Sequence, residues 1–267
     1  MTGEEAHGQS GLPRRESFDD VAELYDRARP GYPDQLLKDI VALAGLSQAS
    51  KILEIGCGTG QLTLPLARTG ATIVAVELGT RLAAIARRNL AGFGNASVVN
   101  AAFEDWPPPD EPFDCVVSAT AFHWVDPEIR LIKSARALRP GGLAAVVATH
   151  QVAGGTSGFD DAAQPCYAQW TGADPAFRLP VADMVVGEDE LERSPLFGSV
   201  SVHRYVRELA YTSQSFADLL GTFSPELALT DVARDGLKAC LGALIDSKFG
   251  GKIMKQYLNE LQVAAVR

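Results

Sequence analysis

Residues 51–60 read KILEIGCGTG, an apolar run that ends in three glycines at alternate positions. The run predicts a short buried strand, and the glycines allow a tight turn that brings the backbone close to a ligand. Residues 61–69 then predict a helix, which Gly70 ends. Because the first amides of a helix have no partner within it, this unit is typical of a cofactor-binding turn.

Strand and helix patterns alternate from residue 72 to residue 149. Strands are expected at 72–77, 97–99, 113–118 and 143–149, and helices at 81–90 and 128–138. This alternation predicts a parallel sheet with helices on both faces, an α/β fold of the doubly wound, Rossmann-like kind. Ligands of such sheets bind at the carboxyl ends of the strands, where the strand order reverses.

The flanking segments are interpreted from the same periodicity. Apolar spacing predicts helices at 18–29 and 36–46, ahead of the first strand. Residues 151–198 lack the alternation of strand and helix patterns, which predicts an inserted cap. Strand character returns at 200–211, two helical pieces fill 213–249, and 252–266 has strand-like composition. The 267 residues therefore predict a disordered leader at 1–17 and one elaborated domain at 18–267.

Composition narrows the function classes. The chain is 46% hydrophobic and 21% charged, as globular proteins are, and its net charge is -9. Nucleic-acid binding depends largely on Lys and Arg, so the acidic balance favours a small-molecule substrate over DNA or RNA. The leader lacks the apolar core of a secretory signal, and no run approaches the roughly 20 apolar residues of a membrane span. We expect a soluble cytoplasmic protein, a monomer or homodimer, with no membrane or nucleic-acid partner.

The four cysteines, Cys57, Cys115, Cys166 and Cys240, form no CxxC pair. The four histidines show no ligand-like spacing with them, so no metal site is expected. A chain of this size does not depend on a disulfide scaffold, and we expect four reduced, mostly buried thiols.

Two acidic residues flank the glycine loop. Glu54 stands two residues before the first glycine, and Glu77 closes the second strand. A carboxylate at that strand end accepts hydrogen bonds from ribose hydroxyls. Dinucleotide sites prefer the pattern G-x-G-x-x-G, whose third glycine would fall at residue 61, where this chain has Gln61. An NAD-dependent oxidoreductase is therefore the weaker alternative. Carboxylates beside the loop suit a cofactor that carries an amino group and a sulfonium.

The pattern E-x-G-x-G-x-G at 54–60 resembles motif I of class I S-adenosylmethionine (SAM) dependent methyltransferases. FEDW at 103–106, FDCVVS at 113–118 and LRPGG at 138–142 resemble further motifs of that family, in its order. YDRARPGYP at 25–33 and AFHWV at 121–125 resemble its type 11 branch, and the trans-aconitate methyltransferase-like members most closely. The resemblance implies a seven-stranded sheet. It also divides the domain into an N-terminal helical gate (18–50), a cofactor core (51–150), a cap (151–198) and sheet-completing elements (199–267).

The resemblance also implies residue roles. Glu77 is expected to bind the ribose, and Glu54 with the glycine backbone to line the methionine half of the cofactor. The expected cofactor residues are Glu54, Gly56, Cys57, Gly58, Gly60, Glu77, Leu78, Phe103, Glu104, Ser118 and Ala119, with Thr120 beside the sulfonium. Ala102 stands where many members have Asp, which leaves the adenine contacts to Glu104 or the backbone.

Methyl transfer from SAM is an in-line displacement at carbon, so alignment and desolvation carry much of the catalysis. A carboxylate acceptor needs no general base, whereas a phenol or amine can need one. The catalytic candidates are His123, as base or substrate-positioning residue, Tyr25 and Arg29. Purely structural roles remain the alternative, with His123 packed on a helix and Arg29 fixing a turn. The expected substrate residues are Tyr32, Trp124 and Trp170.

The predicted function is SAM-dependent methylation of a small molecule, with S-adenosylhomocysteine as product. O-methylation of a carboxylate or hydroxyl leads, and N- or C-methylation stays open. A SAM-binding lyase, cyclase or non-methylating protein would keep the same glycines and stays open too. A nucleic-acid methyltransferase is disfavoured by the charge and by the sequence SATA at 118–121, which lacks an Asn/Asp-Pro-Pro-aromatic motif.

Overall fold

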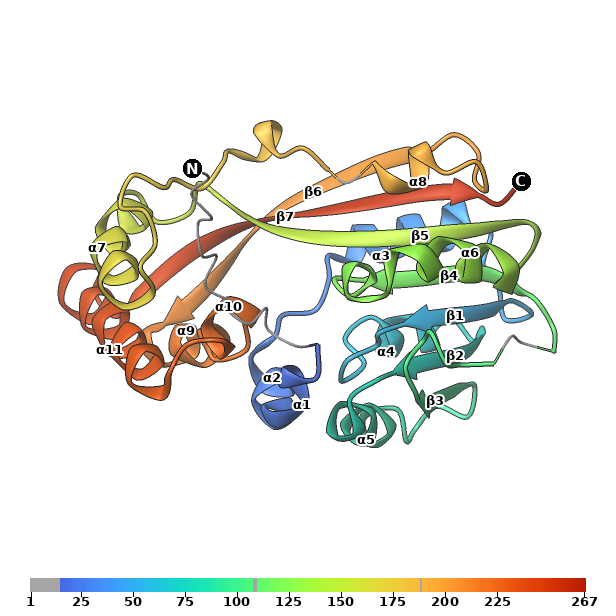
Figure 1. Cartoon of the computed structure of the whole chain (residues 1–267), viewed down its shortest axis with the longest axis horizontal. Helices are drawn as coiled ribbons and strands as arrows, with labels where there is room; N and C mark the ends of the chain where they lie inside the picture. Colours follow the sequence, from blue (N-terminus) through green and yellow to red (C-terminus); the bar gives the residue numbers. More distant parts are fainter. Residues whose placement is uncertain (1–14, 108–109, 188) are drawn as a thin grey trace, which may run out of the picture.

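A seven-stranded sheet forms the centre of the computed structural model, which describes residues 15–107, 110–187 and 189–267 (Figure 1). The strand order is β3-β2-β1-β4-β5-β7-β6. The strands are β1 (Lys51–Ile55), β2 (Thr72–Glu77), β3 (Ala96–Asn100), β4 (Phe113–Ala119), β5 (Leu138–Val152), β6 (Ser201–Thr212) and β7 (Lys252–Ala265). β1 to β5 pair in parallel, and β7 runs antiparallel to β5 and β6. The predicted Rossmann-like α/β fold is confirmed.

Helices cover both faces of the sheet, because successive strand residues point to opposite sides. The helices are α1 (Ser17–Asp20), α2 (Ala22–Ala28), α3 (Asp34–Leu43), α4 (Thr63–Ala67), α5 (Thr80–Asn89), α6 (Pro127–Ala137), α7 (Phe159–Thr171), α8 (Glu190–Arg193), α9 (Ser213–Leu220), α10 (Ser224–Leu227) and α11 (Asp231–Lys248), with 3-10 turns η1 (Phe122–Trp124) and η2 (Ala182–Met184). In β1, Ile52 packs in a buried cluster with residues of α3 and α4, whereas Leu53 packs in one with residues of α6 and α8.

Strands β5, β7 and β6 continue past the end of β4. β5 pairs with β4 as far as Val147, and its residues 148–152 pair with β7 alone. Helices α7, α9, α10 and α11, here called the distal lobe, lie at the far end of this extension (Figure 1). Phe159 of α7, Leu237 of α11 and Tyr257 of β7 share its buried core. The Rossmann-like core and the distal lobe are therefore carried on one continuous sheet.

The segments beyond the core differ from the expectation in their details. Residues 213–249, expected as two helical pieces, form three helices, since Ser224 and Pro225 begin the short helix α10 rather than a break. Residues 151–198 include the end of β5, α7, η2 and α8, and α7 packs against α11 of the distal lobe.

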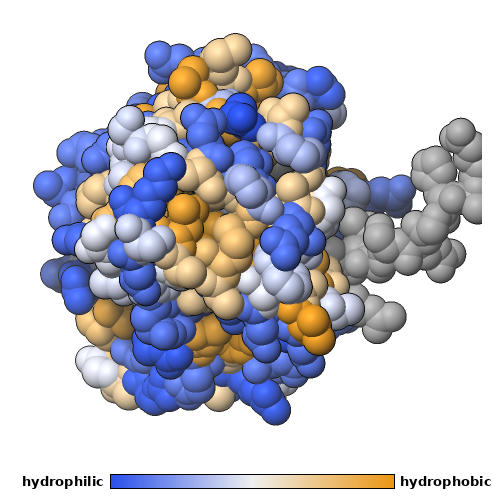
Figure 2. Space-filling model, turned by 90° about the vertical axis from the view of Figure 1, so that its left-hand side faces the viewer, coloured by the Kyte–Doolittle hydropathy of each residue, from blue (hydrophilic) through white to orange (hydrophobic). Residues whose placement is uncertain are grey.

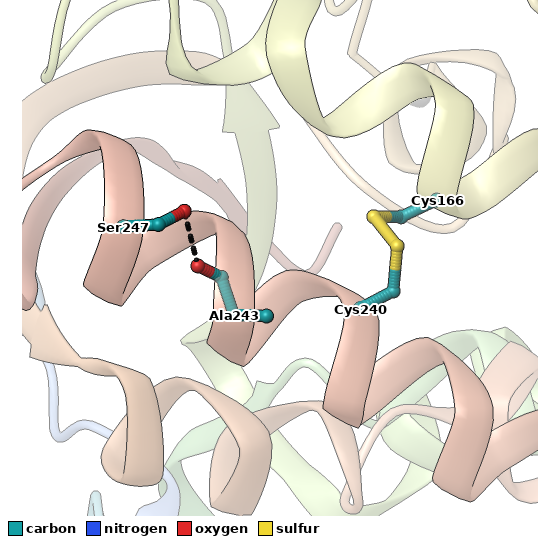
Figure 3. Close-up of a disulfide and its surroundings, with 4 residues drawn as sticks. All are labelled: Cys166, Cys240, Ala243 and Ser247. Atoms are coloured by element: carbon teal, nitrogen blue, oxygen red, sulfur yellow. Dashed lines mark hydrogen bonds between the residues drawn. A yellow bond between two sulfur atoms is a disulfide. The ribbon is translucent and has the colours of Figure 1, made fainter.

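The expectation of four reduced thiols is wrong for two of them. Cys166 of α7 and Cys240 of α11 form a disulfide (Figure 3), whereas Cys57 and Cys115 are free and buried. The bonded residues are separated by 74 positions and meet only because α7 and α11 pack together. Their spacing therefore carried no signal in the sequence.

The expected leader lies mostly outside the described residues, which begin at Arg15. Residues 15–17 depart from the expected disorder, because α1 begins at Ser17 and Arg15 pairs with Glu104. Among the described helices, none is long and apolar enough to cross a membrane. Within the same residues, no group of three or more His, Cys, Asp or Glu side chains could hold a metal ion.

Candidate cofactor and acceptor site

A cavity of about 740 Å³ lies along the carboxyl ends of the central strands, within the size range of small-molecule sites. Its lining includes eleven residues that the sequence singled out: Tyr25, Arg29, Gly56, Gly58, Glu77, Leu78, Phe103, Glu104, Thr120, His123 and Trp124. The lining continues to β5, the η2 segment, α10 and β7. The cavity therefore extends from the Rossmann-like core to the distal lobe, and residues of both line it.

The glycine loop between β1 and α4 forms one wall. Gly56, Gly58 and Gly60 have φ values of 70°, 58° and 97°, a region that L side chains rarely adopt. A Cβ atom on Gly56 would lie 2.5 Å from the Cβ of Ala121. Only glycine lets the loop pass this close to the turn after β4, so its backbone faces the cavity directly.

Glu77 fastens this loop to the end of β2. Its two carboxylate oxygens accept hydrogen bonds from the amides of Gly58 and Gly79, each at 2.8 Å. Burial raises the pKa of Glu77, and these amide hydrogen bonds act in the opposite direction. Each carboxylate oxygen has a second lone pair, so Glu77 can also accept from ligand hydroxyls in the cavity that it lines.

Several expected cofactor residues lie behind the cavity wall rather than in it. Glu54 is 1% exposed, and burial raises the pKa of its carboxyl to about 7, with the charge of Glu77 adding to the effect. Ser118 donates to the carbonyl of Ile55 at 2.9 Å. The buried set outside the lining is Glu54, Cys57, Gly60, Ser118 and Ala119. Their contribution is to hold the loop and the end of β4 in place.

Phe103 and Glu104 line the end of the cavity next to Leu78. The Phe103 ring stacks on Trp106, and the Lys133 ammonium lies 5.3 Å from its centroid. One Glu104 oxygen accepts from Arg15 at 2.5 Å and from the Asp126 amide at 3.1 Å. The other oxygen is buried with no hydrogen-bond partner among the described residues.

Helix α2 closes one side of the cavity through Tyr25 and Arg29. The Tyr25 ring lies beside Gly58, where a Cβ would approach it to 3.4 Å. Arg29 donates to the hydroxyl of Thr222 at 2.9 Å and to its carbonyl at 2.5 Å, and its guanidinium carbon lies 4.6 Å from the Phe223 ring centroid. Arg29 therefore ties the N-terminal helices to the turn between α9 and α10.

The 3-10 turn η1 comes after the end of β4 and brings His123 and Trp124 to the cavity. Their ring centroids are 4.9 Å apart, and Trp124 packs edge-on against Phe18 at 5.6 Å. The sequence placed both residues beyond this strand, and both line the cavity beside the glycine loop.

Two of the expected substrate residues stand elsewhere. The Tyr32 hydroxyl lies 3.3 Å from Oγ1 of Thr120, but its ring is outside the cavity lining. Trp170 packs onto Gly236 of α11, where a Cβ would lie 2.5 Å from the indole. The structure therefore places Trp170 in the helix–helix contact of the distal lobe, outside the cavity lining, and its position does not support the expectation that it contacts the substrate.

The far end of the cavity was missed by the sequence analysis. His150 of β5 and Glu226 of α10 line it together with Tyr257 of β7. His150 Nε2 and one Glu226 oxygen are buried and have no hydrogen-bond partner in the described part of the chain. Burial raises the pKa of Glu226, although the nearby Arg29 charge acts the other way. His150 comes directly after a predicted strand end, which was the one available signal; Glu226 and Tyr257 had none.

The glycine loop and Glu77 form the end of the cavity here called the near end. The residues at this end fit a SAM molecule. The side-chain-free loop at Gly56 and Gly58 leaves room for a ligand against the backbone, and Glu77 offers acceptors to ribose hydroxyls. The acidic residues in the lining are Glu77, Glu104 and Glu226, which suits a ligand with a sulfonium and an amino group.

Comparisons with known proteins agree with this fit. Residues 52–142 match the family described as "Methyltransferase domain". An uncharacterized methyltransferase of Mycobacterium tuberculosis is 36% identical over 130 residues, which are 47% of this chain and 49% of that protein. The chain thus matches about half the length of this relative.

Solved structures share the fold over nearly the whole chain. A SAM-dependent methyltransferase from Geobacter sulfurreducens, in complex with S-adenosylhomocysteine, has a TM-score of 0.52 at 13% identity, covering 96% of this chain and 100% of that one. A putative type II methyltransferase from Anaeromyxobacter dehalogenans has a TM-score of 0.58 at 22% identity, covering 90% and 97%.

Residues 52–142 therefore form a methyltransferase domain, and the chain has the Rossmann-like fold of solved SAM-dependent methyltransferases. The predicted family and cofactor are confirmed, and an NAD-dependent oxidoreductase is not favoured. The likeness to trans-aconitate methyltransferases stays a prediction, as do the roles of individual residues.

Proposed function

We propose that this chain is a SAM-dependent methyltransferase that methylates a hydroxyl group of a small molecule. The observation that carries the proposal is the continuous cavity that joins the glycine loop and Glu77 to His150 and Glu226, whose buried Nε2 and carboxylate oxygen have no hydrogen-bond partner among the described residues. One end fits the cofactor, and the other offers hydrogen-bond partners to an acceptor. A site built for both substrates is what a two-substrate transfer requires.

When bound, SAM supplies an activated methyl group for in-line transfer to the acceptor oxygen. Glu77 holds the ribose, the backbone at Gly56 and Gly58 sets the depth of the cofactor, and Tyr25 with Arg29 excludes water from the α2 side. His123, beside the end of β4, is proposed to take the hydroxyl proton or to orient the acceptor. Glu226 accepts a hydrogen bond from the acceptor and so aligns it.

The charges at the far end favour a hydroxyl over a carboxylate acceptor. Among the described residues of the cavity lining, the permanent cations are Arg15 and Arg29. Arg15 is paired with Glu104, and Arg29 is bound to Thr222. The Thr222 oxygens are uncharged, so Arg29 keeps its positive charge; a carboxylate acceptor bound beside Glu226 would nevertheless face the ionised form of Glu226, which repels it.

The proposal is tested by binding and by product analysis. Calorimetric titrations with SAM, S-adenosylhomocysteine and NADH should show binding of the first two only. Methyl-labelled SAM is then incubated with matched pools of alcohols and phenols, carboxylic acids, and amines, and products are identified by mass spectrometry. Label in hydroxyl compounds supports the proposal. SAM binding without transfer to any pool supports a non-methylating SAM protein, and NADH binding without SAM binding overturns the proposal.

A further inference from the structure

The segment between α7 and α8 exposes four large apolar side chains. Phe177 is 53% exposed, Val181 49%, Met184 74% and Val186 91%. This segment, here called the apolar rim (residues 177–186), includes η2 and forms the upper crest of the molecule in Figure 1. Figure 2 shows apolar side chains at the same crest, surrounded by hydrophilic surface. Exposed apolar side chains that are concentrated on one short segment indicate a binding partner that covers them.

The rim is held in this position by polar contacts to strands β6 and β7. Arg204 of β6 donates to the carbonyls of Ala182 and Val185. Arg204 also pairs with Glu260 of β7 at 2.8 Å, and Glu260 is only 2% exposed. A Cβ on Gly187 would overlap the Glu260 carboxylate, so any other residue at this position would have to displace the carboxylate that Arg204 holds.

The Val185 side chain of the apolar rim points toward the sheet, and the residues on either side of it are exposed. Val185 packs with Val152 and Leu258 of the sheet, while Met184 and Val186 on either side of it remain exposed. Val185 follows η2 in an extended conformation, with a φ of -70° and a ψ of 121°. The exposed side chains are therefore presented by an anchored backbone.

The rim is continuous with the far end of the cavity. Pro180, Met184, Val185 and Val186 line the same cavity as His150 and Glu226. Phe223 and Pro225 belong to the same lining. Apolar side chains therefore extend from His150 and Glu226, at the far end of the cavity (here called the acceptor end), to the surface of the molecule.

We propose that the acceptor is an amphiphile whose hydroxyl-bearing head binds at His150 and Glu226 and whose hydrocarbon chain leaves the cavity along the apolar rim. This inference rests on the proposed function, because it assigns the chemical class of the acceptor. The hydrocarbon chain covers Met184 and Val186, whose exposure is otherwise unfavourable in water. A fully polar small acceptor would leave this path without a purpose.

Alkylphenols of increasing chain length test the proposal. Phenol, 4-propylphenol and 4-hexylphenol are titrated into the protein saturated with S-adenosylhomocysteine. Affinity should rise about two- to fourfold for each added methylene, the range expected for its partial or full burial. The double variant Met184→Asp/Val186→Asp should lose most of this rise. Val232→Asp is the matched control, because Val232 is 76% exposed on α11 and outside the cavity lining.

The outcomes separate this inference from the proposed function. Equal affinity across the series, or an unchanged rise in the double variant, overturns the amphiphile and leaves the methyltransferase proposal standing. Flotation of the protein with phosphatidylcholine vesicles, without any chain-length dependence, also overturns it and assigns the rim to a lipid surface. Failure of the wild-type protein to bind S-adenosylhomocysteine overturns the proposed function itself.

Discussion

The phenolic oxygen of Tyr32 lies 3.3 Å from Oγ1 of Thr120, the first residue after β4, which has a φ of 56°. Among the described residues, Thr120 alone combines a positive φ with a side chain. Its hydroxyl is also 3.2 Å from that of Thr149, which accepts from Asn259 at 2.7 Å. Contacts from Tyr32 and from Thr149, which is itself bonded by Asn259, thus hold a backbone conformation that costs about 1–2 kcal/mol for a non-glycine residue.

Tyr32→Phe tests whether this contact shapes the cavity wall. Loss of the hydroxyl should lower the free energy of unfolding by about 1 kcal/mol and weaken S-adenosylhomocysteine binding several-fold, since Thr120 lines the cavity. Tyr205→Phe is the control: its hydroxyl bonds Asp39 at 2.5 Å, away from the cavity. Calorimetry and urea unfolding measure both effects. Equal affinities of the two variants would contradict a role of Tyr32 at the site.

Glu77→Gln tests the ribose contact. The amide cannot accept from both Gly58 and Gly79 and carries no charge for ligand hydroxyls, so SAM affinity should fall by about 1–3 kcal/mol. Glu208→Gln removes the same charge on exposed β6 and should bind SAM as the wild type does. Titration calorimetry gives both dissociation constants, and an unchanged value for Glu77→Gln would refute the assignment.

Glu54 makes the stability of the protein depend on pH. Burial raises its pKa to about 7, against 4.5 for an unperturbed glutamate, so between these values the native state holds a proton that the unfolded state has released. This contribution to stability is full below about pH 4.5 and is lost as the pH rises through 7. The loss is about 3 kcal/mol.

Urea unfolding at pH 5 and pH 8, without cofactor, measures this effect. The wild type should lose more stability between the two pH values than Glu54→Gln does, because the variant has no carboxyl to ionise at that buried position. The comparison cancels other titrating groups. Parallel losses in the two proteins would show that Glu54 does not ionise in this range.

The disulfide of Cys166 and Cys240 should stabilise the distal lobe. Cross-links that close long loops restrict the unfolded chain and contribute about 2–4 kcal/mol. Thermal unfolding in the presence and absence of a thiol reductant should show a lower Tm for the reduced wild type. The double variant Cys166→Ala/Cys240→Ala should match the reduced protein and ignore the reductant. A reductant effect of equal size in the variant would have another cause.

The core of this fold could be predicted because its signals are local. The strands around Ile52 and Val116 are short apolar runs, and the loop at Gly58 marks the cofactor turn within a few residues. Elements from β1 to β5 therefore appear in the expected order. The seven-strand count came from the resemblance, since β7 gives only a weak pattern in the sequence.

The acceptor end could not be predicted because its residues meet only through the tertiary fold. His150, Glu226 and Tyr257 are brought together by the extension of β5 and β7 and by the position of α10. Trp170 was misplaced for a related reason. A large aromatic residue in an insertion can line a pocket or pack between helices, and only the neighbouring Gly236 shows which applies.

The run of β5 beyond Val147, where only β7 accompanies it, has a consequence for how such proteins diversify. Every residue of the glycine loop and its acidic neighbours precedes Val147, whereas the acceptor end is built largely from residues later in the chain. On the proposed function, mutation in this later part can change the acceptor without altering the residues assigned to the methyl donor.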